Sequence, residues 1–231
     1  MLGIVFAILS SGSKGLEKIA HRYVLANEDS VSYAFVWNLL SSLLFLPLFI
    51  LEFNLPQEPW TWSLVLISST LWALVSYFGF KAYSSLEVSL KEPIGKSKIF
   101  FVLFLSVLFL RESLTVEKVI GTLLIFGGVI LVTYHQRKRF GSFRDKGVIY
   151  TLISAFLSAV VLLVDKYGMM FFKPEMYSFL VYFIPAVILF PLVIRKKLEL
   201  KSIVQQRFGA TIMAVVLGSS YYLIFDFLAF F

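Results

Sequence analysis

Long apolar stretches without charged side chains recur along the chain, separated by short polar segments. Most of them are 16–22 residues long, which suits a helix that crosses about 30 Å of hydrocarbon at about 1.5 Å of rise per residue. The stretches are 30–51, 60–80, 99–110, 119–134, 147–164, 176–194 and 208–225. With a first helix at 2–20, the pattern predicts about eight transmembrane helices in an all-α bundle. Strands are not expected, because period-two alternation is missing.

The stretch 99–110 is too short to span a bilayer alone, so its helix must include the polar segment 89–98. Pro93 and Gly95 lie in that segment. Proline removes a backbone donor and glycine tolerates a local break. Broken backbone at membrane depth persists only where it is buried in protein or lines a wet cavity. The sequence therefore predicts an interrupted helix that faces a central cavity.

The two halves of the chain are related at a constant offset of 144 residues without a gap. The offset matches Gly3 with Gly147 and Pro47 with Pro191. Shared apolar composition is the alternative explanation. If the repeat is real, its unit has five helices, and an odd number of crossings places the two units in opposite orientations. We divide the chain into a first repeat (1–136), a basic linker (137–146) and a partial second repeat (147–231).

The second repeat is incomplete by this count, because it supplies three helices where the first supplies five. The counterparts of 84–134 are missing after residue 231. A truncated gene product is the simplest explanation, and a natural eight-helix protein is the alternative.

Composition narrows the class of protein. The chain has 231 residues, of which 59% are hydrophobic and only 15% charged, and its mean hydropathy is +0.86. A soluble domain carries about 25% charged residues, so a soluble enzyme and a disordered chain are excluded. The net charge is +7, but the basic residues lie in short loops, where they orient a protein in a bilayer. We expect the lipid bilayer as a partner, and no nucleic acid.

Lysine and arginine are distributed unequally between alternate loops. The first, third, fifth and seventh loops hold 1 + 1 + 5 + 5 = 12 of them, and the other loops hold 4. The positive-inside rule places the basic linker in the cytoplasm and the N-terminus outside. If a cysteine introduced at Ser142 were labelled from outside intact cells, the predicted orientation would have to be reversed.

Charged side chains inside spanning helices are costly and therefore mark candidate functional positions. Lys14, Glu17 and Lys18 share one face of the first helix. They predict a polar cavity wall, with Glu17 as a partner for substrate or proton. The alternative is that the first helix ends early and leaves these groups among lipid headgroups.

The fourth helix carries the densest cluster of charges, with Lys91, Glu92 and Lys96 around its proline. We expect this cluster to face the cavity, with Glu92 neutralising one lysine. The alternative is a helix that starts at the interface with lysines reaching toward water.

Trp72 and Asp226 complete the set of candidate substrate-binding residues. Trp72 falls inside a span, where helix packing is the alternative role, and Asp226 follows 18 uncharged residues in the last helix. Asp165 is interpreted as a loop charge, and His21 as a solvated residue at a helix end. No metal-ligand spacing, phosphate-binding loop or nucleophile motif occurs. The sequence therefore predicts no enzyme activity, no cofactor and no metal.

Part of the first half resembles a known family. The segment from Pro93 through Phe109-Leu110-Arg111-Glu112-Ser113-Leu114-Thr115 to Gly127-Gly128-Val129 is similar to the drug/metabolite transporter superfamily, specifically to its EamA-type ten-helix members. The resemblance implies transport of small metabolites, often export, through a cavity between two repeats. It also implies that both ends are cytoplasmic, against the charge distribution.

These observations favour a secondary active transporter in the cell membrane that works by alternating access. In and near the helices, six lysines outnumber four acids, which favours an anionic or zwitterionic small-molecule substrate such as an amino acid. The lysines are Lys14, Lys18, Lys81, Lys91, Lys96 and Lys98, and the acids are Glu17, Glu87, Glu92 and Asp226. The rival hypothesis is a non-transporting membrane fragment or assembly subunit that needs a partner. A second copy of the chain, forming a homodimer, is a further candidate partner.

Overall fold

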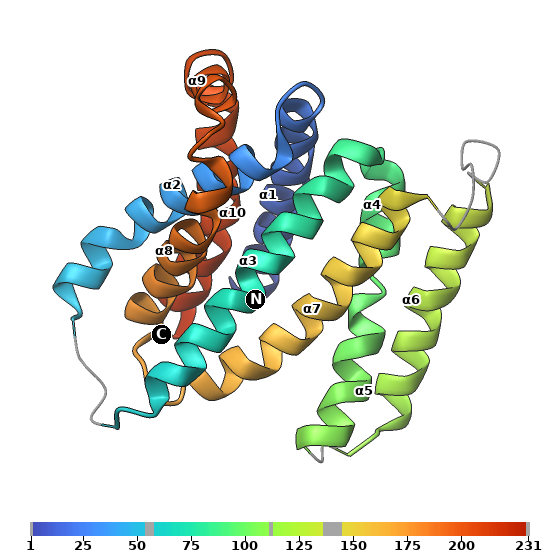
Figure 1. The fold of residues 1–231 in the computed structure, drawn as a ribbon. Helices are drawn as coiled ribbons and strands as arrows, with labels where there is room; N and C mark the ends of the chain where they lie inside the picture. Colours follow the sequence, from blue (N-terminus) through green and yellow to red (C-terminus); the bar gives the residue numbers. More distant parts are fainter. Residues whose placement is uncertain (1, 54–57, 111–112, 136–144, 230–231) are drawn as a thin grey trace. The chain divides into compact units, whose positions relative to one another are not determined.

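The computed structural model of the chain is all-α (Figure 1). It describes residues 2–53, 58–110, 113–135 and 145–229, and side chains within 11–53, 58–109, 113–131 and 145–219. No strand occurs in these residues. The helices are α1 (Leu2–Leu25), α2 (Ser30–Leu51), α3 (Thr61–Ser85), α4 (Val88–Gly95), α5 (Lys98–Leu110), α6 (Val116–His135), α7 (Lys146–Gly168), α8 (Pro174–Val193), α9 (Lys197–Gln206) and α10 (Phe208–Ala229).

The helices form two compact units. Unit 1 comprises Met1–Leu55 and Phe172–Phe231, and unit 2 comprises Pro56–Phe171. These units are defined by packing, whereas the repeats 1–136 and 147–231 are defined by sequence similarity, so the repeat boundaries stay a prediction. Most of the predicted linker, 137–144, lies outside the described residues.

In unit 1, α1 packs against α10, and α2 packs against α8. Both pairs run antiparallel (Figure 1). At one end of the unit, Asp29 accepts hydrogen bonds from Ser32 and contacts Nζ of Lys196 at 2.8 Å. At the other end, Lys173 Nζ lies 2.6 Å from the carboxylate of Glu52. The short helix α9 was not predicted, because its ten residues include two lysines and a glutamate and carry no long apolar run.

Unit 2 is built around the antiparallel pair α3 and α7 (Figure 1). Gly147 allows close packing at the start of α7, since a Cβ there would lie 2.6 Å from Cγ of Leu86. Helices α4 and α5 both pack against α7. Helix α6 contacts α4 and α5.

The predicted fourth spanning helix is interrupted, as the sequence indicated. Helix α4 ends at Gly95, and α5 begins at Lys98. Between them, the amide of Ser97 donates to the carbonyl of Ile94, and that of Ile99 to the carbonyl of Lys96. These tight i to i+3 bonds turn the chain between the two helices.

The outer surface is apolar, as expected of a protein surrounded by lipid. Within the described residues, α2, α3, α7 and α8 are long and apolar enough to cross a membrane. Large apolar side chains point outward, for example Leu124 with 72% and Leu131 with 71% of its surface exposed. A soluble protein rarely exposes contiguous apolar surface on this scale. The fold is therefore that of a polytopic helical membrane bundle, as predicted.

Candidate functional site

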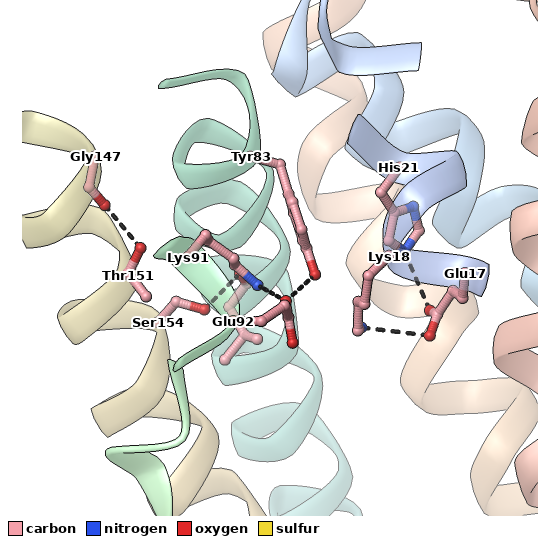
Figure 2. Close-up of polar contacts among 10 residues, drawn as sticks. Glu17, Lys18, His21, Tyr83, Lys91, Glu92, Gly147, Thr151 and Ser154 are labelled. Atoms are coloured by element: carbon pink, nitrogen blue, oxygen red, sulfur yellow. Dashed lines mark hydrogen bonds and ion pairs between the residues drawn. The ribbon is translucent and has the colours of Figure 1, made fainter. Parts of the chain in front are cut away.

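A buried chain of polar side chains lies in unit 1, and Figure 2 shows Glu17, Lys18 and His21 of it. Glu17 is 5% exposed, His21 2% and Tyr33 is fully buried. Glu17 Oε1 lies 3.1 Å from His21 Nε2, and His21 Nδ1 lies 2.8 Å from the Tyr33 hydroxyl. Lys18 Nζ lies 3.3 Å from Glu17 Oε2, nearer the surface. Four side chains thus form one connected network that runs from a half-buried lysine to a fully buried phenol.

Local sequence brings this network together. Glu17 and His21 are four residues apart, so their side chains meet on one face of α1. Tyr33 reaches the same place from α2 because only a short turn separates the two helices, and Asp29 caps the start of α2. The interpretation of His21 as solvated was wrong. The end of α1 is covered by α2, and a helix-end position in the sequence does not reveal such cover.

Helix α10 approaches Glu17 at a glycine. A Cβ on Gly218 would lie 2.7 Å from Glu17 Oε1. Any larger residue at position 218 would have to displace the carboxylate or the helix. The packing of α1 against α10 therefore depends on a glycine that faces a buried acid.

A second network lies in unit 2 and involves three side chains, Tyr83, Lys91 and Glu92 (Figure 2). The Tyr83 hydroxyl donates to Glu92 Oε1, and Lys91 Nζ lies 3.0 Å from the same oxygen. Lys91 Nζ also lies 3.7 Å from the centroid of the Tyr83 ring. The expected pairing of Glu92 with a lysine is thus present, and Lys91 is the partner. One tyrosine contributes both a hydrogen bond to the acid and a cation–π contact to the base.

A buried carboxylate in unit 2 was not predicted. Asp165 of α7 accepts a hydrogen bond from the Ser68 hydroxyl and another from the Trp72 indole N–H at 3.0 Å, both on α3. Asp165 is only 8% exposed, so the loop interpretation was wrong. Its donors lie far away in the sequence, and the apolar run ended one residue before it. The only available signal was that an acid directly follows a long apolar run.

The remaining candidate residues are Lys14, Lys96 and Asp226. Lys14 and Lys96 are exposed, and the side chain of Asp226 lies outside the described residues. Glu17 and Lys18 come together in unit 1, and Lys91 and Glu92 come together in unit 2. Among the described residues, no group of three histidine, aspartate or glutamate side chains could hold a metal ion.

The sequence matches the model of the EamA-like transporter family over residues 1–134, which is more than half of the chain. The chain belongs to the EamA-like transporter family. The matched range nearly coincides with the predicted first repeat, 1–136. A comparison with curated proteins found no match.

EamA membership gives the two ion-paired networks a context. The EamA-like family is one of membrane transporters, and the apolar outer surface is that of a membrane protein. The protein is therefore a membrane transporter of small molecules. In an EamA-like protein, acids and lysines inside apolar helices are the natural candidates for contact with the transported molecule, because burying them is costly.

Proposed function

We propose that the protein is a secondary active transporter that exports small metabolites, such as amino acids or amphiphilic compounds, across the cell membrane. It would work by alternating access to a central cavity and would cross the membrane several times. The observation that carries this proposal is the presence of two glutamates, Glu17 in α1 and Glu92 in α4, each paired with a lysine.

The paired charges suit a zwitterionic substrate. An isolated buried charge costs several kcal/mol or more, whereas a paired one is tolerated (about 3–5 kcal/mol is lost when one partner is removed). An amino acid carries one ammonium and one carboxylate. It can insert between a lysine and a glutamate and leave neither protein charge without a partner. The proposed substrate-binding residues are Lys14, Glu17, Lys18, Lys91, Glu92, Lys96, Trp72 and Asp226.

The helix pairing supports the inverted-repeat plan on which alternating access depends. The offset of 144 makes α1 the counterpart of α7, and the sequence order makes α3 the counterpart of α10. Unit 1 contains the antiparallel pair α1 and α10, and unit 2 contains the antiparallel pair α7 and α3. Each helix of one pair therefore has its counterpart in the other pair. Such repeats are typical of secondary transporters.

Flux through reconstituted protein tests this proposal. Proteoliposomes loaded with a mixture of labelled amino acids are expected to release label faster than protein-free liposomes. Glu92→Gln is expected to slow release, because it leaves Lys91 without its acid. Glu52→Gln is the matched control, since Glu52 is an exposed glutamate paired with Lys173 at a helix end. It should release label like the wild type.

Two outcomes would contradict parts of the proposal. Transport of quaternary amines in preference to amino acids would show that the argument from charge is wrong. An absence of flux for either class would favour the rival hypothesis of a membrane subunit that needs a partner.

A further inference from the structure

The network of Glu17, His21 and Tyr33 has a property that substrate binding does not require. Its three side chains are joined end to end by hydrogen bonds of 3.1 and 2.8 Å, and all three are at least nine-tenths buried. Histidine is the side chain whose charge changes most readily near neutral pH. We infer that this network is a proton-binding site and that the proton it carries is the ion to which transport is coupled. This inference rests on the proposed function.

The hydrogen bonds allow the imidazole to be either neutral or charged. With a neutral His21, Nε2–H donates to the Glu17 carboxylate, and Nδ1 accepts from the Tyr33 hydroxyl. When a proton from water binds Nδ1, the Tyr33 oxygen turns from donor to acceptor, because a hydroxyl can do both. The only bond that forms is the N–H bond, and the same bond breaks when the proton leaves to water. Both imidazole nitrogens keep a partner in either state, whereas the Tyr33 O–H no longer donates to Nδ1 once that nitrogen is protonated.

The surroundings supply a counterion for the charged state. Glu17 faces the imidazolium directly, and the Trp37 ring of α2 lies 5.8 Å from the imidazole centroid. The other charged side chains on this part of α1 are Lys14, Lys18 and Arg22. On α2, the titratable group that faces His21 is Tyr33. The described side chains of α10, 208–219, include no titratable group.

The packing at Gly218 leaves little space on the α10 side of the Glu17 carboxylate. Glu17 Oε1 lies so close to α10 that a single Cβ at position 218 would come within 2.7 Å of it. A proton requires no space, and Lys18, whose side chain is 29% exposed, joins the buried acid to the surface.

Two transport measurements on the same proteoliposomes separate proton coupling from substrate binding. The first is exchange of the labelled amino-acid mixture against unlabelled mixture, with equal pH on both sides. The second is accumulation of the mixture driven by an imposed pH gradient. The variants are His21→Gln and Tyr33→Phe, with Glu52→Gln as the control. Size-exclusion chromatography in detergent confirms that each variant is folded.

The wild type and Glu52→Gln are expected to perform both processes. His21→Gln should retain exchange but lose gradient-driven accumulation to the background level, because His21 is not one of the proposed substrate-binding residues. Tyr33→Phe should retain both, with its pH profile displaced, because only one hydrogen bond of the imidazole is removed.

Each other outcome overturns a distinct claim. Exchange by the wild type without any response to a pH gradient would overturn the proton assignment and leave the proposed function intact. A parallel loss of exchange and accumulation in folded His21→Gln would show that His21 is needed for substrate binding and would overturn its assignment to proton coupling. The absence of exchange in the wild type would refute the proposed function itself.

Discussion

Asp29 connects three parts of unit 1 through one carboxylate. Its Oδ2 accepts hydrogen bonds from the backbone N–H and the hydroxyl of Ser32, and in this way Asp29 caps the start of α2. Its Oδ1 lies 2.8 Å from Nζ of Lys196, just before α9. Burial alone would raise the pKa of Asp29, but the hydrogen bonds from Lys196 and Ser32 outweigh it and hold that pKa below its ordinary value.

This pKa predicts how stability changes with pH. A carboxyl group with a lowered folded-state pKa stabilises the fold above its unfolded pKa and loses that contribution as the pH falls through the folded pKa. Asp29→Asn is expected to lower stability by about 0.5–1 kcal/mol at neutral pH, since asparagine still caps a helix but loses the ion pair. Thermal unfolding in detergent from pH 7 down to pH 3 measures the stability difference between the variant and the wild type. The difference from wild type should shrink on acidification, and a constant difference would contradict the prediction.

Single residues also mark the limit of prediction from the sequence. The pairing of Glu92 with a lysine was predicted because both charges lie in one short segment. The burial of His21 and Asp165 was not, because the groups that cover or bind them come from other helices. Ser68 and Asp165 are almost a hundred positions apart, and no local pattern shows that their helices are neighbours.

At the scale of whole helices, the length of the uncharged apolar runs determined which helices could be predicted. The uncharged run 30–51 coincides with α2, and 147–164 lies inside α7, which continues to Gly168. Helix α7 is longer than its apolar run because Asp165 has polar partners on α3. Helix α9 was missed for the opposite reason, since its ten residues, with two lysines and a glutamate, carry no long apolar run to reveal it.

Asp165 of α7 accepts hydrogen bonds from two side chains of α3, so we expect its replacement to lower the free energy of unfolding strongly. Replacing it with leucine leaves the Ser68 hydroxyl and the Trp72 indole without their acceptor. Unfolding should become easier by about 2–4 kcal/mol, whereas Asp165→Asn should cost less because an amide oxygen can still accept. Thermal unfolding followed by tryptophan fluorescence measures both. Lys166→Gln, an exposed neighbour on the same helix, is the control, and an equal loss for it would contradict this explanation.

At the scale of the molecule, the contacts within each unit follow the predicted alternation of loops. In unit 1, Asp29 of the first loop meets Lys196 of the seventh, and Glu52 beside the second meets Lys173 of the sixth. In unit 2, Gly147 after the fifth loop meets Leu86 of the third. Loops of equal parity therefore meet within each unit. Parity follows from counting spans, so this part of the topology was predictable from the sequence.

Cysteine labelling tests the orientation that the charges predict. The chain has no cysteine, so each introduced one is unique. Ser202→Cys in α9 should be protected from a membrane-impermeant maleimide added to intact cells, and Glu52→Cys should react. The reverse pattern would place the basic loops outside and show that the charge distribution misled us. Reaction of both from one side would contradict the alternation itself.

The two units are formed by different segments of the chain, and this has a consequence during synthesis. Unit 2 is a continuous segment, Pro56–Phe171, whereas unit 1 joins the N-terminal helices to the C-terminal ones. Domains generally fold as units while the nascent chain emerges. When the ribosome has released the last helix of unit 2, α1 and α2 still lack α8 and α10. We therefore expect Glu17 and His21 to enter the membrane before their final neighbour, α10, has been synthesised.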